Sequence, residues 1–195
     1  MGAIEVGQPA PSFRLPTGHG SELGTDDYRG RNHLVVWFTK GMACPFCRTQ
    51  MSQLARGYPR LQAAGAEVLQ VTPTRPQRAA FYAKNFPLPF PYLCDPDYAV
   101  HRAWGLELRS RSLAWYARTF YTASRLPHPP PSGLGEPKMA LRELPGLLHD
   151  SDMGFFVVDR QGTVRYRHTS PYAGEHGFNV IPSVDEVVQQ LEQCT

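Results

Sequence analysis

The chain of 195 residues is long enough for one well-packed domain with an elaboration, and 42% of its residues are hydrophobic. Its net charge of +3 comes from basic residues scattered along the sequence, so we expect no nucleic-acid partner. No apolar run reaches the length of a membrane span, and the first residues lack the pattern of a signal peptide. These features predict a cytoplasmic protein with no membrane partner, in which the four cysteines are thiols rather than a disulfide framework.

The first strong pattern is an unbroken apolar run at residues 34–38, which contains β-branched and aromatic side chains. It is too short for a core helix and ends before Lys40 and Gly41, so it predicts a buried central strand. The segment before it is expected to be extended at a sheet edge, because Pro9 and Pro11 exclude a central strand.

A helix that carries two cysteines is predicted directly after this strand. Pro45 suits a first helical turn, so the helix should begin at or just after Cys44. Its apolar face is formed by residues at spacings of four and three, namely Cys47, Met51, Leu54, Tyr58 and Leu61. Cys47 is therefore expected to face the core, whereas Cys44 lies beyond the helix end, exposed to solvent and within disulfide reach of Cys47.

The Cys-x-x-Cys spacing at a helix start indicates redox chemistry. The unpaired N–H groups and the positive end of the dipole at a helix N-terminus both favour a thiolate over a thiol. A structural disulfide or half of a zinc site would use the same spacing, but zinc needs a second ligand pair, and Cys94 and Cys194 stand alone. We therefore expect no metal and no organic cofactor. Cys94 is interpreted as a buried thiol at a strand end, with a resolving role as the alternative.

The chain after the cysteine helix predicts a second strand, parallel to the first. Gly57 and Pro59 indicate a kink or a break in the helix, and Gly65 suits its C-terminal end. Residues 66–72 then form a strand, which a right-handed crossover joins to the first strand in parallel. Active sites of such sheets lie at the carboxyl ends of the strands, where Cys44 is expected.

Two further helices are predicted in the next part of the chain. The first spans residues 76–85, with a proline in its first turn and Phe81 facing inward. Prolines then keep residues 88–94 extended. The second helix has Asp95 as its N-cap and runs through Trp104.

Residues 106–150 contain a predicted helix with interleaved arginines, whose apolar positions are Leu113, Tyr116, Ala117 and Phe120. We interpret this helix as packed over the sheet edge, with a mobile lid or a dimer surface as the alternatives. Residues 126–137 predict an irregular loop because they contain five prolines and two glycines. One more helical turn is expected at residues 139–144.

The last part of the chain predicts a hairpin and a terminal helix. Residues 154–168 place a turn between two β-forming stretches. Ser183 and Glu186 have the spacing of a capping box. The apolar face of the helix that follows comprises Val184, Val187, Val188 and Leu191. His168 and His176 are interpreted as solvated side chains, with an acid–base role as the alternative.

Several of these segments resemble the peroxiredoxin (AhpC/TSA) family of the thioredoxin-like superfamily. Residues 6–15 are similar to its opening segment, and residues 23–30 to its short helical turn before the first buried strand. Residues 91–97 also resemble the family pattern, with Cys94 where a small polar residue is common. The hairpin is similar to the closing antiparallel pair of thioredoxin-like proteins.

The resemblance covers residues 4–105 and 152–191. It implies one α/β domain of thioredoxin-like fold over residues 1–195, in which helices flank a central mixed sheet. Residues 106–150 would be an inserted helical and loop segment in this domain.

The cysteine motif resembles that of a peroxiredoxin-like subgroup with Cys-Pro-Phe-Cys. Counted without gaps from the strand end, Cys47 falls on the family's peroxidatic cysteine and Cys44 on the threonine of its Pro-x-x-x-Thr-x-x-Cys motif. Lys40 takes the place of the motif's proline, and Gln50 that of a common acidic residue.

Two mechanisms follow for this pair. In one, Cys44 attacks and Cys47 resolves the product; in the other, the roles are reversed and an arginine polarises the peroxide. The expected exposure favours Cys44, the family register favours Cys47, and we give exposure the greater weight because a nucleophile must be reached. The supporting residues are Thr39, Lys40, Pro45 and Arg48. The candidates for the arginine are Arg109, Arg111 and Arg118.

The resemblance implies a thiol-dependent antioxidant enzyme that reduces peroxides or disulfides through a Cys44 and Cys47 dithiol–disulfide cycle. Its reductant would be of the thioredoxin or glutathione type, and a homodimer is left open. One alternative is a redox sensor or interaction module without enzymatic activity. A second is a general protein thiol–disulfide oxidoreductase, which is disfavoured because residues 151–154 replace the cis-proline that thioredoxins use to hold a substrate chain.

Overall fold

The computed structural model describes residues 2–125, 143, 150–171, 173–174, 177–178 and 181–194. A six-stranded sheet has the order β5-β4-β3-β7-β6, and β8 also pairs with β7. Its strands are β3 (His33–Phe38), β4 (Ala66–Thr72), β5 (Tyr92–Cys94), β6 (Leu108–Arg109), β7 (Asp150–Val158) and β8 (Val164–Pro171). The helices are α1 (Pro45–Ala63), α2 (Pro76–Asn85), α3 (Ala99–Ala103), α4 (Leu113–Arg125) and α6 (Val184–Glu192). The smaller elements are β1 (Arg14–Pro16), β2 (Glu22–Gly24), η1 (Thr25–Asp27), β9 (Ala173–Gly174) and β10 (Gly177–Phe178).

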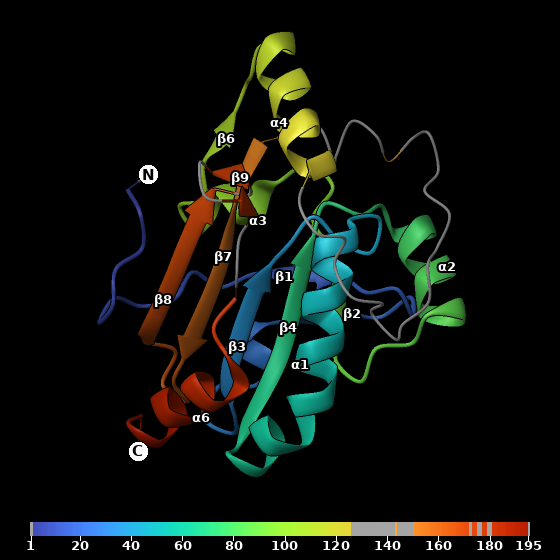
Figure 1. The fold of residues 1–195 in the computed structure, drawn as a ribbon. Helices are drawn as coiled ribbons and strands as arrows, with labels where there is room; N and C mark the ends of the chain where they lie inside the picture. The colour runs from blue at the N-terminus through green and yellow to red at the C-terminus, as the bar shows by residue number, and fades with distance from the viewer. Residues whose placement is uncertain are drawn as a thin grey trace.

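The central strand β3 is buried along its whole length, as its apolar run predicts. It pairs in parallel with β4 and antiparallel with β7, where Phe38 lies opposite Gly154. The parallel crossover from β3 through α1 to β4 is therefore confirmed, as are the mixed sheet and its flanking helices (Figure 1). Because β7 runs antiparallel to β3, the first residues of β7 lie at the same end of the sheet as the carboxyl end of β3.

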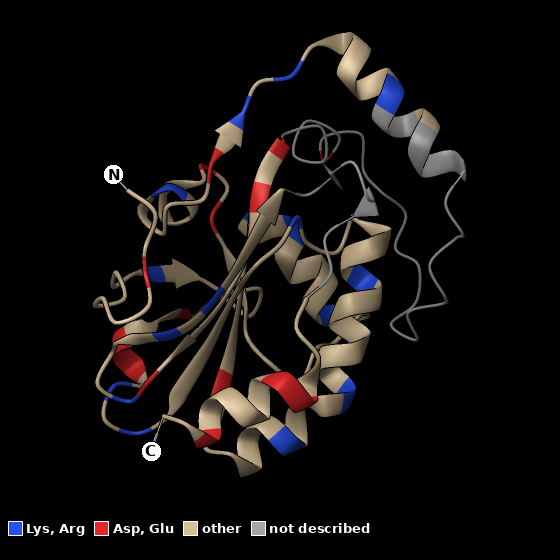
Figure 2. Ribbon diagram, turned by 60° about the vertical axis from the view of Figure 1, so that its left-hand side comes forward, with Lys and Arg blue, Asp and Glu red and all other residues tan. Residues whose placement is uncertain are grey.

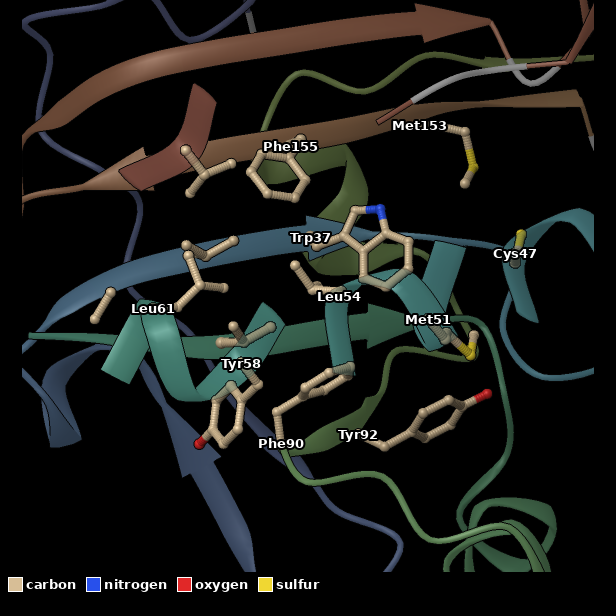
Figure 3. Packing of buried hydrophobic residues seen from close by; sticks show 14 of the residues in the cluster. Trp37, Cys47, Met51, Leu54, Tyr58, Leu61, Phe90, Tyr92, Met153 and Phe155 are labelled. Carbon is tan, nitrogen blue, oxygen red and sulfur yellow. The ribbon is translucent and has the colours of Figure 1, made fainter. Parts of the chain in front are cut away.

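Alternating residues of β3 separate the core into two layers. Val35 and Trp37 belong to a cluster that includes side chains of α1, α2 and α6. Figure 3 shows this layer, with Trp37 above Leu54 and Met51 of α1 and Cys47 beyond the strand's carboxyl end. Residues 34, 36 and 38 of β3 face the opposite layer, which contains α3 and part of the N-terminal segment.

Helix α1 begins at the predicted residue but does not break. Cys44 is its N-cap and Pro45 its first residue. Pro59 lies inside one continuous helix, so of the predicted kink or break the break is wrong and the kink stays a prediction. Gly57 serves close packing instead, because a Cβ there would lie 2.3 Å from Cγ2 of Val184 in α6. Burial of one face against the sheet stabilises the helix through its unfavourable residues. It ends before Gly65, whose φ of +74° fits the predicted stop.

Helices α2 and α3 differ from prediction in detail. The bounds of α2 are as predicted, but Phe81 is 42% exposed rather than inward, and Ala79 and Tyr82 are the buried residues. Helix α3 starts later than expected, with Tyr98 as its N-cap at a φ of +55°. The carboxylate of Asp95 still accepts a hydrogen bond from the backbone N–H of Ala99, at 2.9 Å.

Helix α4 forms where it was predicted, but parts of its apolar surface are not covered. Leu113 is 88% exposed and Tyr121 57%, so the interpretation of a helix packed over the sheet edge is wrong for these residues. In Figure 1, α4 projects beyond the carboxyl ends of β3 and β4. An apolar stripe predicts a buried face but does not say which element covers it. The predicted loop at 126–137 lies outside the described residues, as does the turn at 139–144 apart from Glu143.

The hairpin and the terminal helix predicted for the C-terminal part are confirmed. Strands β7 and β8 form the hairpin, and β7 extends further back than predicted, to Asp150. Ser183 caps α6 by accepting a hydrogen bond from the backbone N–H of Glu186, at 3.2 Å. None of the described helices has both the length and the apolarity that a membrane span requires.

Candidate active site

The loop between β3 and α1 is held by hydrogen bonds to neighbouring strands. The backbone N–H of Thr39 continues the ladder to the carbonyl of Val71, at 3.0 Å. The backbone N–H of Met42 donates to Tyr92 Oη at 3.1 Å, and that oxygen lies 2.7 Å from Thr74 Oγ1. Tyr92, the first residue of β5, therefore fixes the conformation of the chain just before the cysteines.

Gly41 is required at this turn for two reasons. Its φ is +83°, a left-handed conformation that disfavours residues with a Cβ. A Cβ at this position would also lie 2.5 Å from Tyr92 Oη and 2.7 Å from Thr74 Oγ1. The glycine lets the backbone approach the tyrosine closely, and this contact sets the start of α1.

The two cysteines lie together at the N-terminus of α1. Cys44 Sγ accepts a hydrogen bond from the backbone N–H of Cys47 at 3.2 Å and so caps the helix. The Cys44 side chain raises the pKa of the Cys47 thiol, and the backbone N–H and charge of Lys40 lower it, so both residues lie close to the Cys47 sulfur. Both are free thiols, and the disulfide between them that the spacing predicts stays a prediction.

The predicted exposure of Cys44 is wrong. Its exposed fraction is 0% and that of Cys47 is 1%, so both sulfur atoms are buried. Because the Cys44 side chain turns back to cap the helix, it points into the protein instead of leaving the helix end. Exposure therefore no longer distinguishes an attacking from a resolving cysteine.

Lys40 is a buried cation that acts on the two thiols. It is only 4% exposed, and burial lowers the pKa of its ammonium to about 8, against the opposing effect of Cys47, Cys44 and Asp150. Burial raises the pKa of the Cys47 thiol well above its ordinary value, as does its contact with Cys44. The backbone N–H and the charge of Lys40 act in the opposite direction on that thiol.

The other supporting residues have separate roles. The Arg48 side chain is buried and folds back across the loop, where Nη1 donates to the carbonyl of Met42 at 3.0 Å. Thr39 Oγ1 accepts hydrogen bonds from the backbone N–H of Gly41 and from Gln70 Nε2, both at 3.0 Å. Pro45 is exposed at the first position of α1 and contributes its fixed φ.

Two of the three candidate arginines are bound by carboxylates of β7. Arg109 forms a two-point ion pair with Asp152, and Arg111 Nε lies 2.7 Å from Asp150 Oδ2. Both carboxylates are at the start of β7, which carries acidic residues at this end (Figure 2). Arg118 is exposed on α4. Lys40 therefore acts on the cysteines, Thr39 and Arg48 bind the loop before them, and Arg109 and Arg111 are held in other ion pairs.

Sequence reasoning missed a buried acid–histidine pair behind the loop. His101 Nδ1 lies 2.7 Å from Asp95 Oδ2, and both side chains are almost fully buried. Burial lowers the pKa of His101 despite the opposing effect of Asp95, and the charge of Lys40 lowers it further. The ring of His101 packs edge-on against Phe38, with centroids 4.9 Å apart. An acid before a helix with a histidine in its first turn was the available signal, but only the helix cap was predicted from it.

Of the remaining candidates, Cys94 belongs to the same buried cluster as the cysteine pair, and His176 is outside the described residues. Cys94 is a buried thiol at the end of β5, as interpreted, and burial raises its pKa to about 11. His168 lies in β8 opposite Phe155, and His176 is outside the described residues. Within the described part of the chain, no three His, Cys, Asp or Glu side chains are grouped as metal ligands would be.

Comparisons with known proteins give the chain its family. The AhpC/TSA family model matches residues 6–129, which continues into the segment that the resemblance left uncovered. The chain is 34% identical over 102 residues to Rv2521 of Mycobacterium tuberculosis, a match of 52% of this chain and 64% of that protein. It is 30% identical over 106 residues to peroxiredoxin Bcp of Escherichia coli, covering 54% and 67%. The chain thus spans less than two thirds of the mycobacterial relative's length.

Solved structures agree on the fold. Peroxidoxin BcpB of Mycobacterium tuberculosis superposes with a TM-score of 0.66 at 15% identity, covering 98% of this chain and 99% of that one. The reduced 2-Cys peroxiredoxin of Plasmodium vivax has a TM-score of 0.64 at 14% identity, covering 97% and 81%. The predicted thioredoxin-like fold is confirmed by these likenesses. Because the family model matches well over half of this chain, the chain belongs to the AhpC/TSA family.

Proposed function

We propose that the protein is a thiol peroxidase in which Cys47 reduces a peroxide and Cys44 resolves the product. The observation that carries this proposal is the buried dithiol at the start of α1, which faces a buried lysine in a chain of the AhpC/TSA family. A cation beside a sulfur atom favours the thiolate, which is the nucleophile. No metal or organic cofactor enters this chemistry.

A small substrate fits this site better than a protein disulfide. Thiol–disulfide exchange requires the attacking sulfur to approach a disulfide on another chain directly, whereas Cys44 and Cys47 are both buried. A peroxide needs only an opening of its own width. Residues 151–154, which stand where thioredoxins hold an extended substrate, belong to β7 and are paired with its neighbours. Peroxide is therefore favoured over a general disulfide substrate.

Cys47 is assigned the peroxidatic role. The family register places it on the peroxidatic position, and the backbone N–H of Lys40 lowers the pKa of its thiol. The greater weight first given to Cys44 depended on an exposure that this residue does not have. Cys44 is well placed to resolve, because its sulfur accepts a hydrogen bond from the backbone N–H of Cys47, at 3.2 Å.

The cycle has three steps. The Cys47 thiolate attacks one peroxide oxygen, an S–O bond forms, the O–O bond breaks, and water or an alcohol leaves after taking a proton. Cys44 then attacks the sulfenic acid, which gives the disulfide and water. A dithiol reductant of the thioredoxin type reduces the disulfide by exchange and is itself oxidised. Such a reductant is maintained in reducing compartments, so we place the protein in the cytoplasm. We further propose that the chain is one domain, with residues 106–150 as an insertion.

The test is peroxide consumption by the wild type, Cys47→Ser and Cys44→Ser with a thioredoxin recycling system. We expect Cys47→Ser to lose turnover, and Cys44→Ser to accumulate a sulfenic acid on Cys47 that a dione reagent traps. Trapping on Cys44 in the Cys47→Ser protein would reverse the two roles. If the wild type forms its disulfide only once and slowly, with no turnover, the protein is a sensor and the proposal is wrong.

A further inference from the structure

Lys40 occupies a position that lysine seldom takes. It follows the last residues of the central strand, is 4% exposed, and is one residue before the left-handed turn at Gly41. Lysine side chains are almost never fully buried unless a partner compensates the charge. The neighbours that would benefit from such a cation are the two thiols of α1.

The charged and titratable groups around Lys40 come from three elements. Cys44 and Cys47 act on it from α1, and Asp150 acts from the start of β7. His101 faces it from α3, on the layer that also holds Phe38. Its Nδ1 is engaged with Asp95, and burial keeps the imidazole neutral, so this pair adds no second cation beside Lys40.

One carboxylate oxygen of Asp150 has no partner among the described residues. Its side chain is fully buried, and Oδ2 accepts a hydrogen bond from Arg111 Nε. In the part of the chain that the structure describes, Oδ1 has no hydrogen-bond partner. A buried carboxylate oxygen without a partner among the described residues is costly there, so its place near a buried lysine is informative. Asp150 favours the ammonium form of Lys40.

From this arrangement we infer that Lys40 is a catalytic proton-transfer residue: its amine takes the proton of the Cys47 thiol, and the resulting ammonium gives it to the leaving oxygen. The role rests on the proposed peroxide reduction and adds an acid–base group to it. An arginine in this position could stabilise a thiolate but could not release a proton, because guanidinium stays protonated in proteins.

The proton and electron balance closes within the site. The Cys47 S–H bond breaks and the Lys40 amine becomes an ammonium. The sulfur electron pair then forms the S–O bond as the O–O bond breaks, so sulfur is oxidised and the peroxide reduced. The departing alkoxide or hydroxide takes the proton back from Lys40. The net change is a thiol and a hydroperoxide converted to a sulfenic acid and an alcohol or water.

The acidity of Lys40 suits this exchange. Burial lowers its pKa to about 8, which is close to neutral, where a group can serve as both base and acid. The proton that leaves the site as the pH rises through this range is shared by lysine and thiol. Removing it gives either an amine beside a thiol or an ammonium beside a thiolate, and the second form is reactive.

The first experiment measures thiolate formation without peroxide. The rate of Cys47 alkylation by iodoacetamide is followed by peptide mapping across the pH range in which thiols and amines titrate, in a Cys44→Ser background. We expect Lys40→Met to slow this reaction at neutral pH by about tenfold or more, since the thiolate loses its cation. Lys40→Arg should stay close to the parent protein. Lys84→Met, at an exposed lysine of α2, is the matched control and should change nothing.

The second experiment varies the leaving group. A peracid releases a carboxylate that needs no proton, whereas hydrogen peroxide and an alkyl hydroperoxide release strongly basic oxyanions. With Cys44 present, Lys40→Arg should reduce the rate with the basic leaving groups by about 100-fold, and with the peracid far less. Equal losses for both classes would overturn the proton-transfer role.

The outcomes separate the two proposals. If the wild type consumes no peroxide, the proposed function fails, whatever the alkylation data show. If the wild type is active but Lys40→Met leaves Cys47 alkylation unchanged, Lys40 has no part in thiolate formation and the inference is wrong. Circular dichroism checks each variant; if Lys40→Met does not fold, the leaving-group comparison of Lys40→Arg with the wild type decides.

Discussion

Two buried aspartates at the ends of β7 are used in opposite ways. Asp159 directly follows the strand, and its carboxylate accepts hydrogen bonds from the backbone N–H groups of Gln161 and Thr163 and from Arg165 Nε. Asp150 begins the strand, accepts one hydrogen bond from Arg111, and leaves its other oxygen without a partner among the described residues. Both side chains have no exposed surface.

The difference follows the direction of the sheet. Asp159 lies at the amino end of β3, where the hairpin closes and a satisfied carboxylate stabilises the turn. Asp150 lies at the carboxyl end, beside Lys40 and the cysteines, where active sites of such sheets occur. Full hydrogen bonding of Asp159 favours stability at one end, whereas Asp150 at the other end acts on the lysine beside the cysteines. Variants at the two ends should therefore affect different properties.

The largest expected change in stability is at the satisfied end. Asp159→Ala removes the acceptor for two backbone N–H groups in the turn, so we expect the free energy of unfolding to fall by about 2–4 kcal/mol. Urea unfolding measures this change. Peroxide consumption per folded molecule should be unaffected. Asp185→Ala, at an exposed ion pair with Arg60, is the control and should alter stability little.

The same aspartate gives this stabilisation a defined pH dependence. Burial raises the pKa of Asp159, but the hydrogen bonds from Thr163 and Arg165 outweigh it, and the net pKa is below the ordinary 3.8. Its contribution is present above that value and is lost as the pH falls through the lower folded-state pKa. The stability difference between wild type and Asp159→Asn should therefore shrink in acid. A difference that stays constant there would contradict the account.

A smaller loss in the free energy of unfolding is expected for a substitution in the loop before the cysteines. Gly41 and Gly20 share a φ of +83°, but a Cβ at Gly20 meets no atom within 4 Å, whereas at Gly41 it meets Tyr92 Oη. Alanine at either site should cost about 1–2 kcal/mol for the left-handed backbone. Gly41→Ala should cost about 1–3 kcal/mol more, because the Met42 to Tyr92 contact is displaced. If both variants lose the same free energy of unfolding in thermal or urea titrations, the loop accommodates the Cβ at Gly41 without strain.

At the unsatisfied end, stability should change little and pH dependence should change clearly. Asp150→Asn keeps an oxygen for Arg111 but removes the charge that favours the ammonium of Lys40. The pKa of Lys40 should therefore fall below about 8, and the pH midpoint of Cys47 alkylation should move down by up to about one unit. Asp152→Asn, at the neighbouring Arg109 pair, is the control. An equal shift of the midpoint in both variants would contradict a specific effect of Asp150 on Lys40.

Local patterns in the sequence predicted much of the fold. The strand at residues 34–38, the helix start at Pro45 and the bounds of β4 and α2 were found because each depends on nearby residues: apolar runs, a first-turn proline or a stop glycine. The pairing of the cysteines at a helix start was also available from spacing. These features are confirmed in the structure.

The state of the site could not be predicted in the same way. Whether Cys44 is exposed depends on how its side chain turns at the cap, and whether Lys40 is buried depends on elements more than sixty residues away in sequence. Spacing does not reveal such long-range contacts. These contacts determine that both thiols are buried and that Lys40 is the cation beside them.

The smallest effect is expected beyond the Asp150 end, on α4. Leu113 is 88% exposed and lies two residues after Arg111, which ties this segment to Asp150. Leu113→Ala should change the free energy of unfolding by less than about 0.5 kcal/mol, as surface substitutions usually do. Leu61→Ala, at a fully buried leucine of α1, should cost about 2–5 kcal/mol in the same urea titration. A cost at Leu113 approaching that at Leu61 would mean that another surface covers α4 in solution. The predicted helix packed over the sheet would then be right about burial and wrong only about the partner.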